Sequence, residues 1–291
     1  MLIHNYNEIK KPKNVVVLGS NGFIGKSLSL KLESEGISLK KLSRKDIDLL
    51  SDNASESLAK HLSSEDTLVA TSAIAPCKDP DMLNDNIRIA IVICKAANIA
   101  GCSHVINISS DAVYADTDHL ITENTIKSPD NFHGVMHLAR EIIFTNQIKK
   151  VLTTIRPTLI FGEGDTHNGY GPNQFSRLAN NNQAIKLFGK GEEKRDHIYI
   201  KDVVEIIFSV IQRKSSGVIN VASGDVRSFL EIAKKVSDLS QNTIDIQFSE
   251  RVGPMPHNGY RPFDVSLLKK SFPDITLTPF EEGIKETLKN I

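Results

Sequence analysis

Two histidines stand four residues apart in NFHGVMHLARE, which covers residues 131–141. On a helix, His133 and His137 would share one face, because positions i and i+4 lie one turn apart. An unperturbed imidazole titrates near ~6.5, so this pair could exchange protons with a substrate at neutral pH. The alternatives are a metal site and simple packing. The metal reading lacks the Glu of H-E-x-x-H, and no third ligand is evident.

A second candidate site lies in GSNGFIG, where Gly19, Gly22 and Gly25 follow an apolar run and precede a stretch with helical periodicity. Glycines permit a tight turn and close approach of the backbone to a pyrophosphate, and the helix N-terminus offers free N–H groups. The spacing has one residue more than the common G-x-G-x-x-G pattern. It indicates a dinucleotide site, with an ordinary strand–helix turn as the alternative.

The end of the next strand bears on the choice of cofactor. An acidic residue there would bind a ribose 2′-hydroxyl. This chain has Ser43, Arg44 and Lys45 instead. Two cations and a hydroxyl suit a 2′-phosphate, so we predict NADP, with NAD less favoured. In the alternative, both cations are solvated and Asp46 or Asp48 binds the ribose.

Alternating elements must position these residues. Short β-branched runs predict strands at 14–19, 38–43, 66–72, 104–110, 151–157 and 218–224, and helices are predicted at 23–35, 82–100, 132–148, 173–182, 226–240 and 279–289. Such alternation predicts an α/β fold with a doubly wound parallel sheet of the Rossmann type and a smaller α/β C-terminal substrate lobe. We expect residues 12–161 plus 198–222 to form the dinucleotide-binding domain. Residues 162–197 plus 223–291 would form the substrate lobe.

Composition narrows the class of protein. The 291 residues carry a formal net charge of zero without blocks of like charge, which argues against nucleic acid or a membrane as partner. The N-terminus lacks the apolar core of a signal peptide, and no run of ~18 apolar residues occurs. Cys77, Cys94 and Cys102 have no metal-ligand spacing. We therefore expect a cytoplasmic protein with free, buried thiols.

Several segments together resemble the extended short-chain dehydrogenase/reductases of the NAD-dependent epimerase/dehydratase family. This group acts mostly on nucleotide-linked sugars and includes UDP-glucose 4-epimerase, dTDP-glucose 4,6-dehydratase and dTDP-4-dehydrorhamnose reductase. The matching segments occur in family order over about 17–289, and they are GSNGFIG (19–25), NIRIAIVICKAANIAG (86–101), HVINISSDAVYAD (104–116), RPTLIFGEGD (156–165), LFGKGEEKRDHIYIKDVV (187–204), GVINVASG (217–224) and RPFDVSLLKKSFP (261–273).

The resemblance implies roles for individual residues. Ser110 matches the catalytic Ser or Thr, and Asp111 follows it at a position where several family members have an acid. Asn86 matches a helix asparagine common in the group. The implied substrate-binding residues are Asn173, Arg195 and Arg261, and the two arginines suit a diphosphate. The implied cofactor-binding residues are Gly19, Asn21, Gly22, Phe23, Ile24, Gly25, Ser43, Arg44, Lys45, Asp48, Leu49, Ser72, Ala73 and His137.

The chain departs from the family pattern at 133 and 137. The family helix carries Y-G-x-x-K, in which the lysine lowers the tyrosine pKa and binds the nicotinamide ribose. Here His133 and His137 replace that pair, while Gly134 and Glu141 keep the frame. A histidine is poised near neutral pH without a lysine beside it, so the double replacement is chemically coherent.

We therefore predict an NAD(P)-dependent enzyme that transfers hydride at C4 of a nucleotide-linked sugar. Ser110 would orient the sugar oxygen, His133 would exchange its proton and His137 would hold the ribose. Reduction is favoured over epimerisation or dehydration. The alternative is a cofactor- and sugar-nucleotide-binding regulator whose catalysis is lost, or has moved to Asp111, Tyr114 or Tyr199.

The resemblance also implies an oligomer. Helices at 82–100 and 132–148 often form a four-helix dimer contact in this family. Ile87, Ile91 and Cys94 are apolar residues that fit such a contact, and a core role explains them equally well. We expect a homodimer.

Overall fold

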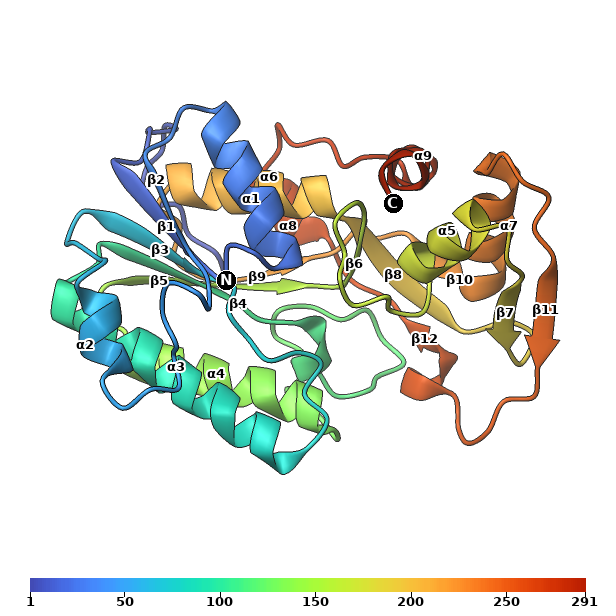
Figure 1. The fold of residues 1–291 in the computed structure, drawn as a ribbon, viewed down its shortest axis with the longest axis horizontal. Coiled ribbons are helices and arrows are strands. Elements are labelled where there is room, and N and C mark those ends of the chain that lie inside the picture. The colour runs from blue at the N-terminus through green and yellow to red at the C-terminus, as the bar shows by residue number, and fades with distance from the viewer.

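A six-stranded parallel sheet forms the larger part of the molecule in the computed structural model, which describes residues 1–291 (Figure 1). Its order is β2 (Leu39–Leu42), β1 (Asn14–Leu18), β3 (Asp66–Ala70), β4 (His104–Ile108), β5 (Val151–Pro157) and β9 (Gly217–Val221). The order reverses at β1, so the loops after β1 and β3 diverge at the carboxyl edge. This is the switch point at which open α/β sheets bind ligands.

Helices cover both faces of this sheet (Figure 1). One face carries α1 (Phe23–Ser34) and α6 (Ile200–Gln212), and the other carries α2 (Ala54–Ala59), α3 (Pro80–Ala100) and α4 (Phe132–Gln147). Asp79 caps α3 by accepting the Met82 amide, and Asn131 caps α4 by accepting the Gly134 amide. These caps fix where the two long helices begin, and hence where His133 and His137 lie.

The smaller part stands beside the carboxyl edge of the sheet (Figure 1). Strand β8 (Lys194–Tyr199) pairs with β10 (Val226–Ser228), β12 (Tyr260–Arg261) and β6 (Leu159–Phe161). Strands β7 (Ile185–Phe188) and β11 (Ile246–Ser249) form a separate pair. The helices are α5 (Pro172–Asn180), α7 (Phe229–Leu239) and α9 (Phe280–Asn290), while α8 (Ser266–Ser271) contacts β9 of the main sheet.

The predicted α/β fold with a doubly wound parallel sheet is confirmed. Each predicted strand and helix is present within a few residues of its expected bounds. Helix α6, the short α2 and α8, and strands β6 to β8 and β10 to β12 were not predicted. The three cysteines are free and buried, as expected.

The two parts share one hydrophobic core of 37 buried residues. Val15 of β1, Ile206 of α6, Phe175 of α5 and Ile232 of α7 all belong to it. The division at 161/162, 197/198 and 222/223 stays a prediction, and residues on both sides of it belong to the shared core. No helix is long and apolar enough to cross a membrane.

Candidate functional site

The glycine turn after β1 is packed too closely for any larger side chain. Gly19 has a φ of 91°, and a Cβ there would lie 2.7 Å from Thr71 Oγ1. A Cβ on Gly25 would lie 2.3 Å from the Gly19 carbonyl oxygen. Gly22 is the N-cap of α1 and supplies no side-chain cap, so the first N–H groups of the helix have no side-chain cap acceptor. This arrangement fits a pyrophosphate, which such N–H groups bind well.

A cavity of about 420 Å³ opens beside this turn. It is lined by most of the predicted cofactor residues, namely Gly19, Asn21, Gly22, Ser43, Arg44, Asp48, Leu49, Ser72 and Ala73. Arg44 is exposed at its edge. Lys45 does not line it. Asp46 accepts hydrogen bonds from the amide and hydroxyl of Ser43, at 2.7 Å each, so its carboxylate is engaged within its own turn.

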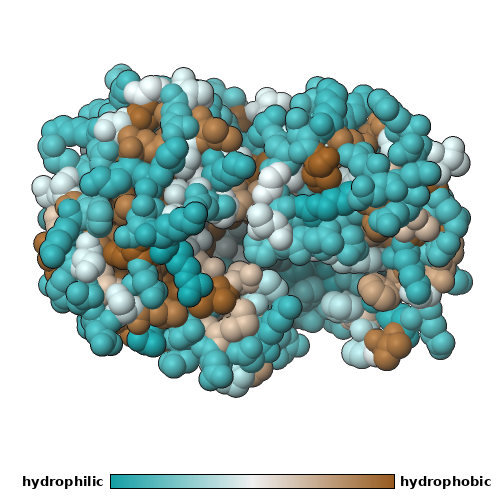
Figure 2. Space-filling view, viewed as in Figure 1, coloured by the Kyte–Doolittle hydropathy of each residue, from teal (hydrophilic) through white to brown (hydrophobic).

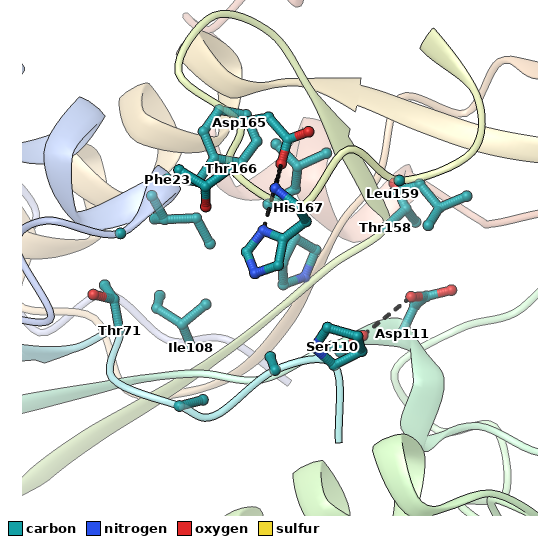
Figure 3. Close-up of a pocket in the computed structure, with 18 of the residues that line it drawn as sticks. Phe23, Thr71, Ile108, Ser110, Asp111, Thr158, Leu159, Asp165, Thr166 and His167 are labelled. Carbon is teal, nitrogen blue, oxygen red and sulfur yellow. Dashed lines mark hydrogen bonds and ion pairs between the residues drawn. The ribbon is translucent and has the colours of Figure 1, made fainter. Parts of the chain in front are cut away.

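A second cavity of about 550 Å³ adjoins the first and shares Gly22, Thr71, Ala73 and Ala75 with it. It lies in the hollow between the two parts of the molecule (Figure 2). Phe23, Ile24 and Gly25 line it on the cofactor side. Figure 3 shows Ser110 and Asp111 on one wall, facing Asp165, Thr166 and His167 on the other. The predicted residues His133, His137 and Asn173 line the same cavity.

The short 3-10 turn η1 (Asp111–Val113) and the start of α4 bring Ser110 and His133 to one place. A Cβ on Gly134 would lie 2.3 Å from the Ala112 carbonyl oxygen, so only glycine allows this approach. Ser110 Oγ accepts the Ala112 amide and lies 3.3 Å from an Asp111 carboxylate oxygen. The rings of His133 and His137 meet edge to face, with centroids 4.8 Å apart.

Both helix histidines are neutral at pH 7. Burial lowers the pKa of His133, and the Asp111 carboxylate opposes this shift. Burial holds the pKa of His137 well below its usual value, and its Nδ1 has no hydrogen-bond partner. The Cys77 amide donates to His133 Nδ1 at 3.4 Å. Because that nitrogen accepts, neutral His133 carries its proton on Nε2.

The two arginines predicted to bind a diphosphate do not line the cavity. Arg261 donates to the Asp111 carboxylate at 3.0 Å, to the Asp111 carbonyl oxygen at 2.7 Å and to Asp116 at 3.1 Å. Arg195 pairs with Glu193 at 2.5 Å and donates to the Pro256 carbonyl oxygen. Both guanidinium groups are buried and already partnered. Their role in binding substrate stays a prediction that requires these partners to be exchanged.

Asparagines predicted in the site hold its framework. The Asn86 side chain exchanges hydrogen bonds with the backbone of Ile74 and donates to Met82, which fixes the loop between β3 and α3. Asn173 lines the cavity and accepts the Gly162 amide at 2.9 Å. Of the two roles left open for Cys94, a dimer contact or a place in the core, the structure shows the core, where its side chain is fully buried.

No lysine lines the cavity, and its only tyrosine is Tyr170. Tyr114 is locked between Arg156 and Asn220, with hydrogen bonds of 2.6 Å to each. Tyr199 donates to Glu163 at 2.9 Å and packs in the core. Neither of these tyrosines reaches the cavity, so relocation of the chemistry to them finds no support in this geometry.

Four titratable cavity residues were not predicted: Asp165, His167, Tyr170 and His197. His197 is buried on β8, neither ring nitrogen has a partner, and burial lowers its pKa to about 3. The sequence could have pointed to His197, because it lies two residues after Arg195, a predicted substrate-binding residue. His167 lies in a Gly- and Asn-rich loop and had no such signal. No group of three or more His, Cys, Asp or Glu side chains is placed to hold a metal ion.

Comparison with known proteins gives the family. The model of the NAD dependent epimerase/dehydratase family matches residues 15–222. The chain belongs to this family. The match spans the Rossmann sheet and reaches the end of β9.

Curated members of the family are similar over different shares of their length. The "uncharacterized UDP-glucose epimerase YtcB" of Bacillus subtilis (strain 168) is 24% identical, over 97% of this chain and 91% of its own. The dTDP-D-glucose 4,6-dehydratase of Mus musculus is 27% identical over 68% of this chain, and the match spans only 58% of that protein's length.

Solved structures share the fold over nearly the whole chain. The UDP-glucose 4-epimerase of Thermus thermophilus, in complex with NAD, has a TM-score of 0.82 at 18% identity, covering 95% of this chain and 98% of that one. The UDP-N-acetylglucosamine 4-epimerase of Methanobrevibacter ruminantium M1, in complex with UDP-N-acetylmuramic acid, has a TM-score of 0.79 at 24% identity, covering 96% and 98%. The predicted family and its Rossmann fold are confirmed, and the family is one of NAD-dependent enzymes.

Proposed function

We propose that this member of the epimerase/dehydratase family transfers hydride at C4 of a nucleotide-linked sugar, with NADP as its preferred cofactor. The observation that carries the proposal is the pair of adjoining cavities. One runs along the glycine turn and past Arg44, and the other contains Ser110 and His133. A dinucleotide laid through both would place its reactive end beside these two side chains, and its nicotinamide ring supplies or accepts the hydride.

Ser110 and His133 would bind the reacting oxygen of the sugar. Neutral His133 presents Nε2–H, so in this state it donates a hydrogen bond and polarises a carbonyl. It becomes a base only when its proton moves to Nδ1, which breaks the contact with the Cys77 amide. His137 lies one turn further along α4 and would donate to a ribose hydroxyl of the cofactor. These roles replace the tyrosine and lysine of the family with two neutral imidazoles.

NADP is favoured by the cation at the edge of the first cavity. Arg44 can form charge-assisted hydrogen bonds with a 2′-phosphate. Asp46 does not line this cavity, and one of its carboxylate oxygens accepts both hydrogen bonds from Ser43. Asp48 also lines the cavity and is the residue that would favour NAD. A preference for NADP leans toward net reduction of a keto-sugar, since an epimerase regenerates its cofactor.

The experiment is an assay of NADPH oxidation with 4-keto sugars linked to UDP or dTDP. Wild type should turn over, and His133→Ala should reduce kcat about 100-fold or more, because positioned acid–base and polarising groups contribute 10²–10⁴-fold. His119→Asn, at an exposed histidine outside the cavity, is the matched control and should behave as wild type. Equal turnover by His133→Ala and wild type would remove His133 from the reaction.

A second candidate function is binding without turnover. It is favoured by one observation: Arg261 holds Asp111 by its carboxylate and its carbonyl oxygen, which withdraws an acid from the site. Tight binding of NADPH and UDP-glucose without turnover of any keto-sugar would support this function instead.

A homodimer through α3 and α4 belongs to the proposal. Ile91 on α3 is 36% exposed and Ile142 on α4 is 53% exposed, so both are available for a contact. Light scattering should give a molar mass of twice the 32.1 kDa of one chain for wild type. The Ile142→Glu variant should have the mass of a single chain. A monomeric wild type would contradict the dimer.

A further inference from the structure

A loop from the smaller part of the molecule brings a histidine and a carboxylate to the wall opposite Ser110 (Figure 3). The loop joins β6 to α5. The Nδ1 atom of His167 lies 3.4 Å from a carboxylate oxygen of Asp165, and the same oxygen accepts the His167 amide at 3.0 Å. The His167 side chain is 48% exposed and lines the cavity, while that of Asp165 is only 5% exposed.

Arg177 of α5 anchors this loop at two points. Its Nη1 donates to Asn168 at 2.8 Å and lies 3.4 Å from the other Asp165 carboxylate oxygen, and its Nη2 donates to the Asp165 carbonyl oxygen. His167 lies between the two anchored residues. A carboxylate that is itself held in place orients an imidazole and stabilises its protonated form.

His133 and His167, which line the same cavity, differ in which ring nitrogen is free. The Nδ1 of His133 accepts an amide hydrogen, so its neutral Nε2 carries the proton. The Nδ1 of His167 lies 3.4 Å from a carboxylate oxygen of Asp165, which favours the tautomer with its proton on Nδ1 and a lone pair on Nε2. Only His167 can therefore accept a proton at Nε2 without first changing its tautomer, and give it back while Asp165 stabilises the imidazolium.

We propose that His167, oriented by Asp165, is an acid–base residue of this site and acts on the sugar from the wall opposite Ser110. The inference rests on the proposed function and adds a catalytic residue to it. In reduction, the carbonyl carbon receives hydride from the reduced nicotinamide and its π electron pair moves to oxygen. That oxygen bonds the proton of His167 Nε2, which leaves an alcohol, an oxidised nicotinamide and a neutral imidazole. In oxidation each transfer reverses.

Charged and titratable groups surround His167. They are Asp165 and Tyr170 on the same loop, Arg177 on α5, and His133, His137, His197 and Asp111 on the other cavity walls. The three other histidines have lowered pKa values and are neutral at pH 7. The nearest charge is the Asp165 carboxylate, with an oxygen 3.4 Å from His167 Nδ1.

The first test is kinetic and uses UDP-4-keto-6-deoxy-D-glucose with NADPH over pH 5–9. His167→Asn should lower kcat about 100-fold or more with KM changed less than about threefold. Asp165→Asn, which removes the charge beside His167 Nδ1, should lower kcat about tenfold. His119→Asn is the control. A kcat within twofold of wild type for His167→Asn, with an unchanged pH profile, would overturn the inference and leave the proposed function standing.

The second test needs no turnover. With ¹³C-labelled histidine, the imidazole signal of His167 is assigned by its loss in His167→Asn and followed as UDP-glucose and NADP are added. We expect UDP-glucose to shift this signal. A signal that UDP-glucose does not move overturns the inference even if wild type reduces the keto-sugar. A shifted signal in a protein without turnover would support the contact while the proposed function fails.

Discussion

The free nitrogen of each histidine decides what that residue can do in this site. Replacing tyrosine and lysine with two histidines keeps a hydrogen-bond donor at position 133. Its Nδ1 accepts the Cys77 amide, so the acid–base capacity expected for His133 is reduced in the neutral state. His167 has the complementary arrangement, with Nδ1 at a carboxylate. From these two contacts we expect His133 to polarise the carbonyl group and His167 to transfer the proton.

The unpaired ring nitrogens of His197 lower the stability of the fold, and we expect them to bind the substrate instead. Neither ring nitrogen has a partner, although the ring lines the cavity and packs against Phe229. A buried unsatisfied polar group costs about 1–3 kcal/mol. His197→Phe should therefore raise the free energy of unfolding by about 1 kcal/mol in urea titrations. The same change should weaken binding of UDP-glucose, because the unpaired nitrogens would otherwise meet its hydroxyls. A destabilised variant with unchanged affinity would contradict this.

Arg44 should determine the choice of cofactor. A charge-assisted hydrogen bond contributes about 1.5–3 kcal/mol, so Arg44→Ala should weaken NADPH binding about 10- to 100-fold and leave NADH nearly unchanged. Lys45→Ala is the matched comparison, because Lys45 is exposed and does not line the cavity. Fluorescence titration with both cofactors measures the effect. Equal or tighter binding of NADH by wild type would contradict the preference.

Which residues could be predicted depends on how local their signal is. Gly19, Gly22, Gly25, Ser110 and His133 sit in short motifs, and the structure places all of them at the two cavities. The pairing of Arg261 with Asp111 joins residues 150 positions apart, and no local pattern reports it. His167 is positioned by Arg177 through side-chain contacts across a loop, so its role becomes visible only in three dimensions.

At the scale of elements, one ionic network joins α4 to β5 and to Ser109, which follows β4. The Glu141 carboxylate accepts Arg156 Nε at 2.7 Å, Arg156 Nη2 at 2.6 Å and the Ser109 hydroxyl at 2.6 Å. Both Glu141 and Arg156 are buried. Ser109 immediately precedes Ser110, so the network also fixes where Ser110 lies.

Glu141→Gln should cost about 3 kcal/mol or more of unfolding free energy, because it leaves the buried Arg156 charge uncompensated. Urea unfolding measures this. Glu286→Gln is the control, since Glu286 pairs with Lys289 on the surface and such pairs contribute about 0–1 kcal/mol. Equal stability of both variants would mean that the buried pair does not hold α4 in place.

The elements that could be predicted are those whose own sequence shows a clear pattern of apolar residues. Strands β1, β3, β4 and β5 are continuous buried runs, and α3 and α4 carry apolar stripes with side-chain caps. Strands β10 and β12 have three and two residues, and only their pairing with β8 makes them strands. Helix α6 contains many β-branched residues, whose run does not distinguish a buried helix from a strand.

At the scale of the whole molecule, burial of histidines ties stability to pH. Burial lowers the pKa of His104 and of His197 to about 3, and that of His137 well below its usual value. Below pH ~6.5 the unfolded chain protonates these imidazoles and the folded chain does not. The unfolded state then binds more protons, so the free energy of unfolding falls as pH falls.

Each of the three histidines should remove roughly 1 kcal/mol of unfolding free energy between pH 7 and pH 5.5. Urea titrations at the two values measure the loss. His104 does not line either cavity. In His104→Gln the loss of unfolding free energy between the two pH values should be roughly 1 kcal/mol smaller than in wild type. A stability that rises toward pH 5.5 would contradict the neutral state of these residues.

At the scale of the whole molecule, the central claim is that hydride passes from the cofactor to a sugar bound between the two parts. The direct measurement is transfer of deuterium from stereospecifically 4-deuterated NADPH to 4-keto sugars linked to UDP or dTDP, followed by mass spectrometry and NMR of the product. We expect a sugar one mass unit heavier, with deuterium at C4. Bound NADPH, shown by fluorescence, together with no deuterium in any sugar would contradict the proposed function.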